Sequence, residues 1–244
     1  MPHDAVDEQK NAARRRTWDL LDQADAAHGG STHGRIPNFR GADQAAALLA
    51  TLPLWQQAQA IKAVPDRAQH PVRALALEHG KTLYMAVPKI ADLKPFRRLN
   101  LARLDVTTQQ AASSSVAVSV GDAVGVDEVQ PIDLIVCGSV AVNRDGVRLG
   151  KGAGYSDIEV ALLTEAGHIT HDTTIVTTVH PLQVVDDDLP ETRHDFRVDL
   201  IVTTEQVITC NQPSRPTGLY WDDLTAEKIA AIPALAERKR AHEL

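Results

Sequence analysis

Short apolar runs alternate with amphipathic stretches along most of this chain. Runs rich in Val, Ile and Leu, typical of strands buried in a sheet, occupy residues 81–87, 116–120, 133–137, 174–179, 199–203 and 207–210. Apolar residues at helical spacing predict helices at 7–24, 42–49, 55–62, 71–79 and 225–240, and a further helix from Ser156. This alternation predicts a three-layer α/β/α fold, in which helices cover both faces of a mostly parallel central sheet.

Turn signals divide these elements. Pro53 separates the second and third helices, and Gly80 ends the helix at 71–79. Asp145-Gly146 lies between apolar residues and predicts a tight reversal after the strand at 133–137. The run at 207–210 is expected at a sheet edge, and the charged helix at 225–240 is a candidate appendage.

The reversal leads into the most specific stretch of the chain, residues 148–157, in which Gly150, Gly152 and Gly154 alternate. Alternating glycines let successive backbone N–H groups converge on an anion, and a helix from Ser156 adds the positive end of its dipole. The pattern indicates a phosphate site; the alternative is a glycine-rich turn after a hairpin. Neither a dinucleotide-binding fingerprint nor a P-loop fits, because the glycines do not directly follow the strand and no Gly-Lys-Ser or Gly-Lys-Thr ends the loop.

Charged and aromatic side chains surround this loop in the sequence. Arg148 and Lys151 add positive charge, and Tyr155 either stacks on a flat ligand ring or packs beside the loop. Lys10 and Arg14 lie one helical turn apart and share a face, which suits phosphate oxygens. The alternative for these two cations is a solvated helix face.

Two aspartates are candidate metal ligands, each with a structural alternative. Asp157 lies in the first turn of the predicted helix, where a carboxylate also serves as a cap or a partner of the dipole. Asp199 begins a strand, a position typical of functional carboxylates in α/β sheets, or is a turn residue. The histidines lack zinc-site spacing, and most are expected to be surface or satisfied polar residues.

Length, composition and net charge limit the classes of function that this chain can have. With 244 residues and 43% apolar residues, the chain can build one substantial core. A net charge of -7 argues against nonspecific nucleic-acid binding. No apolar stretch reaches membrane-spanning length and no signal segment is seen, so a cytoplasmic location is expected. Cys137 and Cys210 lie in apolar runs and are expected to be buried free thiols.

The stretch from Asp133 to Asp157 resembles the signature of the 5-formyltetrahydrofolate cyclo-ligase family, the methenyltetrahydrofolate synthetases, which show Arg-Leu-Gly-x-Gly-x-Gly-Tyr-Tyr-Asp. His194 to Asp199 is similar to the family's His-Asp-x-x-Val-Asp segment, and Lys10 with Arg14 matches its Lys-x-x-x-Arg helix. With His33 to Phe39, the chain looks closest to a paralogous branch that includes the methenyltetrahydrofolate synthetase domain-containing proteins.

The resemblance implies a fold like that of NagB, RpiA and the CoA transferases, with a cyclo-ligase-like domain at 1–211 and an extension at 212–244. It implies ATP and Mg²⁺ as cofactors and a reduced folate as substrate. Phosphates would be held by Lys10, Arg14, Gly150, Gly152 and Gly154, and Mg²⁺ by Asp157 and Asp199. Arg148, Lys151 and Tyr155 would be catalytic. The oligomeric state is left open.

Two departures from the family pattern support a second hypothesis. The family's Glu-Val/Ile-x-Thr segment contacts folate through its glutamate, but Ile61 to Arg67 has no glutamate in register, only Asp66 nearby. Ser156 replaces the second tyrosine of Tyr-Tyr-Asp. The paralogous branch has been linked with thiamine metabolism and RNA-binding modules. The alternative is therefore a paralogue that binds ATP or a phosphate ester without cyclo-ligase activity.

Overall fold

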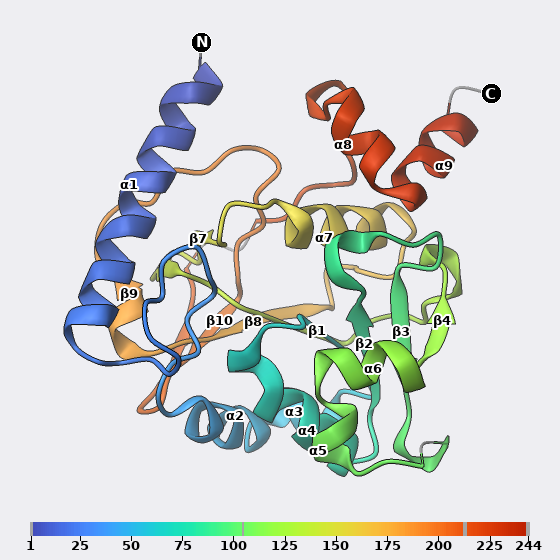
Figure 1. Ribbon diagram of the computed structural model, residues 1–244, viewed down its shortest axis with the longest axis horizontal. Helices are drawn as coiled ribbons and strands as arrows, with labels where there is room; N and C mark the ends of the chain where they lie inside the picture. Colours follow the sequence, from blue (N-terminus) through green and yellow to red (C-terminus); the bar gives the residue numbers. More distant parts are fainter. Residues whose placement is uncertain (1, 104, 212–213, 243–244) are drawn as a thin grey trace.

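A central sheet crosses the molecule in the computed structural model, which describes residues 2–103, 105–211 and 214–242 (Figure 1). Its eight strands in the described chain are β1 (Ala60–Ala63), β2 (Thr82–Ala86), β3 (Phe96–Leu99), β4 (Asp122–Val124), β5 (Leu134–Cys137), β8 (Thr174–Thr178), β10 (Leu200–Val202) and β11 (Val207–Thr209). They lie in the order β11-β10-β8-β5-β1-β2-β3-β4. The five strands from β10 to β2 are parallel, whereas β11, β3 and β4 are antiparallel additions at the edges.

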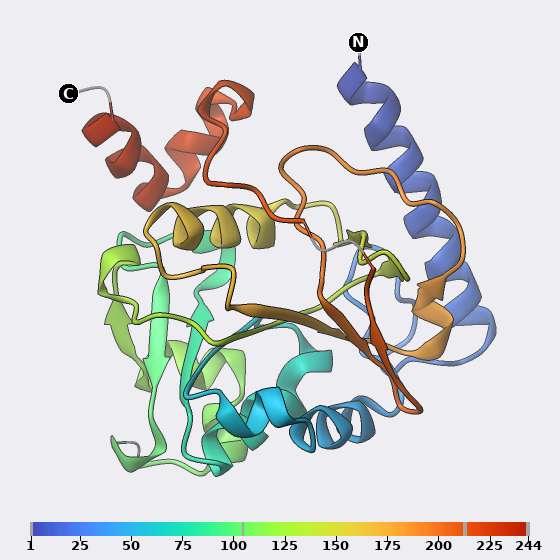
Figure 2. The same cartoon turned by 180° about the vertical axis from the view of Figure 1, so that it is seen from behind.

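Helices cover both faces of this sheet. They are α1 (Pro2–Gln23), α2 (Ala42–Ala50), α3 (Pro53–Gln57), α4 (His70–Glu78), α5 (Thr108–Ala111), α6 (Ser114–Val120), α7 (Tyr155–Glu165), α8 (Ala226–Ala231) and α9 (Pro233–His242). Figures 1 and 2 show α7, α8 and α9 on one side of the sheet and α2 to α6 on the other. One buried apolar cluster joins each set of helices to its face of the sheet. The predicted three-layer α/β/α arrangement is confirmed.

A second, three-stranded sheet of β6 (Ala141–Asn143), β7 (Arg148–Leu149) and β9 (Val184–Val185) lies beside the first. The β6–β7 hairpin is the predicted reversal at Asp145-Gly146, and Gly146 has a φ of 86°. Ala13 of α1 packs against Ala141 and Leu149 of this sheet. That contact brings the N-terminal helix alongside the segment that follows β7.

Three predicted elements were wrong. Residues 60–62 form part of the buried strand β1 rather than the end of a helix, because tertiary burial overrides the helix propensity of Ala and Lys. Residues 116–120 belong to helix α6, although their alternating valines favour a strand. The helix predicted at 225–240 is two helices, since Ile232 before Pro233 is extended.

The C-terminal helices belong to the main apolar cluster. Ile229, Ile232 and Leu235 are buried in the same cluster as Ile158 and Leu162 of α7. The domain boundary at residue 212 stays a prediction, but the helices beyond it share the core of the rest of the chain.

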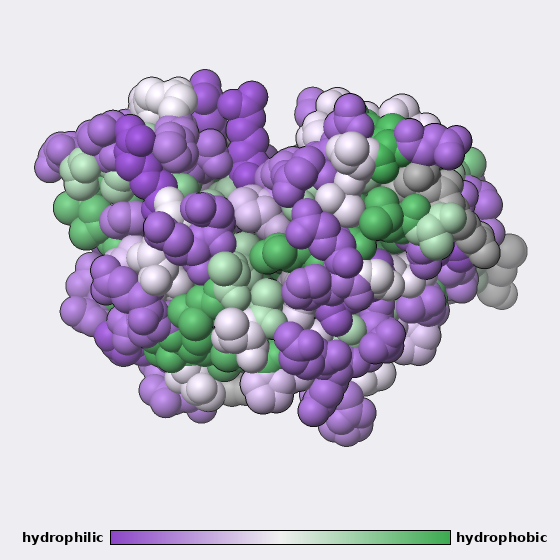
Figure 3. Space-filling view, turned by 90° about the horizontal axis from the view of Figure 1, so that it is seen from below, coloured by the Kyte–Doolittle hydropathy of each residue, from purple (hydrophilic) through white to green (hydrophobic). Residues whose placement is uncertain are grey.

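The surface contrasts with this interior. On the face seen in Figure 3, hydrophilic residues predominate and hydrophobic residues lie in several separate groups. Among the described residues, none of the helices combines the length and apolar character that crossing a bilayer needs.

Candidate functional site

The glycine loop, residues 150–154, connects β7 to α7 at the edge of the sheet where β1, β2 and β5 end. Gly152 and Gly154 have φ values of 99° and 70°, in the region that favours glycine. Over the described chain, the N–H groups of residues 151–156 donate to no backbone acceptor, whereas the Asp157 N–H is bonded to its own carboxylate. Tyr155 and Ser156 begin α7, where helical geometry provides no partner. A row of backbone donors is therefore available to an anion.

Arg14 of α1 lies against this loop. Its Nε donates to the Gly150 carbonyl at 2.7 Å, and its Nη1 donates to Asn11 Oδ1 at 2.7 Å. A Cβ built on Gly152 would lie 3.5 Å from Arg14 Nη1, so the bare glycine leaves the face of the guanidinium open. Burial lowers the pKa of Arg14, and nearby aspartates, Asp195 first, oppose that shift. The predicted helix does place Arg14 at the loop, and its binding of phosphate stays a prediction.

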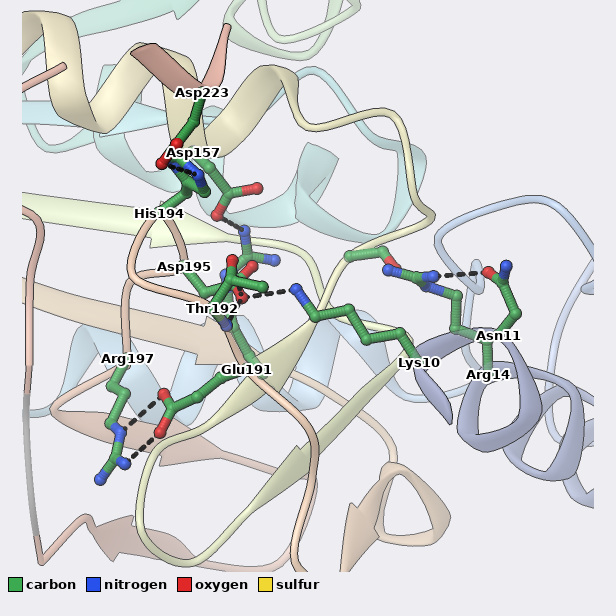
Figure 4. Close-up of polar contacts among 12 residues, drawn as sticks. Lys10, Asn11, Arg14, Asp157, Glu191, Thr192, His194, Asp195, Arg197 and Asp223 are labelled. Atoms are coloured by element: carbon green, nitrogen blue, oxygen red, sulfur yellow. Dashed lines mark hydrogen bonds and ion pairs between the residues drawn. The ribbon is translucent and has the colours of Figure 1, made fainter. Parts of the chain in front are cut away.

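Lys10, one turn earlier, forms an ion pair with Asp195 (Figure 4). Asp195 Oδ2 also accepts from the Thr192 hydroxyl at 2.9 Å. Burial raises the pKa of Asp195, but the bonds from Lys10 and Thr192 outweigh it and hold that pKa below its usual value. Asp195 was not among the predicted site residues, although its position directly after His194 in the family-like segment was the available signal.

Arg148 and Asp157 form a second ion pair behind the loop, with Arg148 Nη2 3.1 Å from Asp157 Oδ1. Arg148 is 4% exposed and its guanidinium lies 4.1 Å from the centre of the Phe196 ring. Its Nε has no hydrogen-bond partner. Burial raises the pKa of Asp157 despite the facing guanidinium. The pair thus keeps both a cation and a carboxylate at the start of α7.

An open cavity of about 720 Å³ lies over the loop, within the range of roughly 300–1,000 Å³ usual for ligand sites. Nine of the ten predicted site residues line it: Lys10, Arg14, Arg148, Gly150, Lys151, Gly152, Gly154, Tyr155 and Asp157. Lys151 extends across the cavity to Asp66, with Nζ 3.4 Å from Oδ1. Asp195 lines the cavity as well.

A sequence model of the 5-formyltetrahydrofolate cyclo-ligase family matches residues 6–204, which include the loop and all the side chains described above. The chain belongs to this family. A methenyltetrahydrofolate synthase domain-containing protein of Mus musculus is 38% identical over 239 residues, covering 93% of this chain and 62% of the relative. That of Homo sapiens is 34% identical over 244 residues, covering 95% of this chain and 61% of the relative. The chain thus spans less than two thirds of the length of these relatives.

Among solved structures, the 5,10-methenyltetrahydrofolate synthetase of Aquifex aeolicus shares the fold of this cyclo-ligase family member. The TM-score is 0.53 at 21% sequence identity, and the match covers 86% of this chain and 94% of that one. The likeness extends across most of both chains, in agreement with the three-layer arrangement. The helices α8 and α9 lie beyond the residues that the family model matches.

Asp199 is the predicted residue that the structure does not bring to this cavity. It precedes β10 and lies at the amino end of the parallel strands, where its Oδ2 accepts from Ile175 N at 2.6 Å and pairs with Arg215. The cavity lies at the carboxyl ends. The physical reason is direct: a residue that begins a parallel strand stands at the edge opposite to the ligand-binding one. The pairing of Asp157 with Asp199 as joint metal ligands therefore has no geometric support.

The donor set limits what kind of metal the site suits. No group of three or more His, Cys, Asp or Glu side chains in the described residues could hold a metal by itself. Mg²⁺ needs only one or two protein carboxylates when substrate phosphates supply further oxygens. Asp157 and Asp195 both line the cavity and fit that requirement.

Proposed function

We propose that this protein catalyses the ATP- and Mg²⁺-dependent conversion of 5-formyltetrahydrofolate to 5,10-methenyltetrahydrofolate. The observation that carries the proposal is the meeting of the open N–H groups of residues 151–156 with Arg14 and Lys10 in one large cavity. Backbone donors at a helix start, assisted by fixed cations, bind phosphate groups strongly. Membership in the cyclo-ligase family supports the same choice.

In the proposed reaction, the formyl oxygen takes the terminal phosphoryl group of ATP, N10 attacks the activated carbon, and phosphate leaves as the ring closes. Such a transfer depends on positioning and charge neutralisation more than on a protein nucleophile. The glycine loop, Lys10 and Arg14 would hold the phosphates. Arg148 and Lys151 would balance the charge that develops on the transferred group, and Tyr155 would provide an aromatic wall.

Asp157, with Asp195 in place of Asp199, would hold Mg²⁺ together with the nucleotide phosphates. When bound, the ion would supply positive charge that offsets the negative charge of the phosphates. Asp157 has one oxygen engaged by Arg148, which fixes the orientation of the carboxylate at the start of α7.

The direct test incubates the purified protein with 5-formyltetrahydrofolate, ATP and Mg²⁺ and follows the absorbance of the methenyl product. Arg14→Met should lower the rate about tenfold or more. Arg15→Met is the matched control, since Arg15 is the neighbouring arginine on the same helix and is exposed. Absence of product from the wild-type protein at high concentration would refute the activity.

A second candidate is a paralogue that binds a phosphate ester without folate turnover. This chain has no glutamate in register with the one by which the family contacts folate. The nearby carboxylate of Asp66 is paired with Lys151, and this pairing favours the second candidate. Calorimetry with ATP and with thiamine phosphate distinguishes the two candidates. Binding of either ligand without methenyl formation supports the paralogue, and no binding at millimolar concentration refutes it.

A further inference from the structure

A smaller cavity of about 220 Å³ adjoins the large one and shares Gly154, Asp157 and Asp195 with it. Ile158 and Ala161 of α7 form one wall. The volume is below the range of roughly 300–1,000 Å³ for pockets that enclose a whole ligand. This cavity therefore suits one part of a ligand whose remainder lies over the glycine loop.

The opposite wall comes from residues 214–228, named here the C-terminal strap, which supplies Leu219, Tyr220 and Leu224. Figure 2 shows this segment passing beside the start of α7 on its way to α8. The strap lies outside the part of the chain that the family model matches. A wall of the cavity is thus built from sequence that the family signature does not contain.

Several polar contacts fix the strap at both ends of this wall. Asp223 pairs with Arg193, whose Nε lies 2.6 Å away. It also pairs with His194 at 2.9 Å (Figure 4). Lys228 Nζ donates to the Ala153 carbonyl at 2.9 Å and lies 4.0 Å from the centre of the Tyr155 ring. The strap is therefore attached directly to the glycine loop.

The chemistry of the cavity favours a flat ring. Ile158, Ala161, Leu219 and Leu224 make its walls largely apolar, while His194 and Asp223 place polar groups at its rim. Apolar walls with a few fixed polar groups are typical of small-molecule sites, and they suit a heteroaromatic ring because its faces are apolar and its edge atoms are polar. Because Asp157 and Gly154 border both cavities, a ring bound here would be continuous with a group held at the loop.

We propose that the C-terminal strap and α7 form a ring-binding subsite, which takes the fused nitrogen heterocycle of a ligand held at the glycine loop. The inference rests on the proposed function, which offers two such rings: the adenine of ATP and the pterin of the folate. The strap then determines which ligands this chain accepts.

The test fills the cavity and measures binding by calorimetry. Ala161→Met extends a side chain from α7 into the space, and Leu224→Trp does so from the strap. Ala166→Met is the matched control, since Ala166 lies at the end of the same helix and does not line the cavity. The probes are ATP with Mg²⁺, 5-formyltetrahydrofolate, and tripolyphosphate, which carries phosphates without a ring. Circular dichroism identifies variants that remain folded.

The subsite predicts that a filled cavity weakens one ring-bearing ligand about tenfold or more, while tripolyphosphate binding stays within about twofold. Loss confined to ATP assigns the adenine, and loss confined to the folate assigns the pterin. Unchanged affinity for both ligands in either folded variant overturns the subsite and leaves the proposed function intact. Equal losses for tripolyphosphate and ATP also overturn it, because they locate the effect in the loop. If the wild-type protein binds none of the probes, the proposed function itself fails.

Discussion

Replacing either partner of the ion pair between Lys62 and Glu159 should destabilise the protein strongly, whereas replacing both should not. Lys62 lies in the central strand β1 and is 1% exposed, and Glu159 lies in α7 and is 4% exposed. The pair joins the middle of the sheet to the helix that follows the glycine loop. Lys62→Met or Glu159→Leu leaves one charge buried without its partner.

The expected magnitudes follow from burial. Leaving one member of a buried ion pair uncompensated costs about 3–5 kcal/mol of unfolding free energy, while replacing both with apolar residues is close to neutral or stabilising by about 1–4 kcal/mol. The pair of Lys94 and Glu128 has the same chemistry with Nζ and Oε2 3.0 Å apart, but both side chains are about half exposed. Such exposed pairs contribute about 0–1 kcal/mol.

Urea unfolding followed by circular dichroism measures both pairs as double-mutant cycles. The buried cycle uses Lys62→Met and Glu159→Leu, and the exposed cycle uses Lys94→Met and Glu128→Leu. We expect a coupling free energy of about 3 kcal/mol or more for the buried pair and below about 1 kcal/mol for the exposed one. If the two buried substitutions add within about 0.5 kcal/mol, the two charges are not coupled and the reasoning is refuted.

Three further predictions concern the loop, the thiols and the pH dependence of stability. Gly152→Ala should weaken tripolyphosphate binding in calorimetry more than Gly167→Ala does. Both glycines have positive φ, but of the two only Gly152 faces Arg14. Equal losses of affinity would show that backbone strain alone matters. Burial raises the pKa of Cys210 to about 12 and also raises that of Cys137, so Ellman's reagent at pH 8 should label neither thiol until urea unfolds the protein. Because the folded pKa of Asp195 is lowered, its contribution to stability should be complete above the ordinary aspartate pKa and lost as the pH falls through the folded value. Asp195→Asn should flatten that acid limb in unfolding curves, and an unchanged limb would contradict the assignment.

The parallel strands β2, β5, β8 and β10 could be predicted because each lies in a run rich in apolar or β-branched residues, but β1 could not. Its sequence, Ala-Ile-Lys-Ala, contains a lysine that is stable in the core only because Glu159 meets it from a distant helix. That pairing depends on tertiary structure and leaves no local pattern. In α6 the valines alternate, but Ala117 is the buried residue of this helix. The alternation therefore did not mark the buried face of a strand.

The candidate site also has parts that the sequence predicted and parts that it did not. The turn at the glycine loop could be predicted from the local spacing of its glycines. That Lys10 and Arg14 lie at this loop was implied only by the family resemblance, because the contact joins segments far apart in the chain. Asp199 was misplaced, although its position before a strand already put it at the amino end. The strap could not be predicted, because its contacts with Ala153 and His194 connect segments far apart in the chain.

Trp18 lies one helical turn beyond Arg14 on α1, and its indole donates to the Arg35 carbonyl while its ring lies against His33. Its fluorescence is therefore sensitive to the same helix that touches the glycine loop. A ligand that moves α1 when it engages Arg14 would change the surroundings of this indole and therefore its emission. The chain thus carries its own optical probe for titrating ligands of unknown identity.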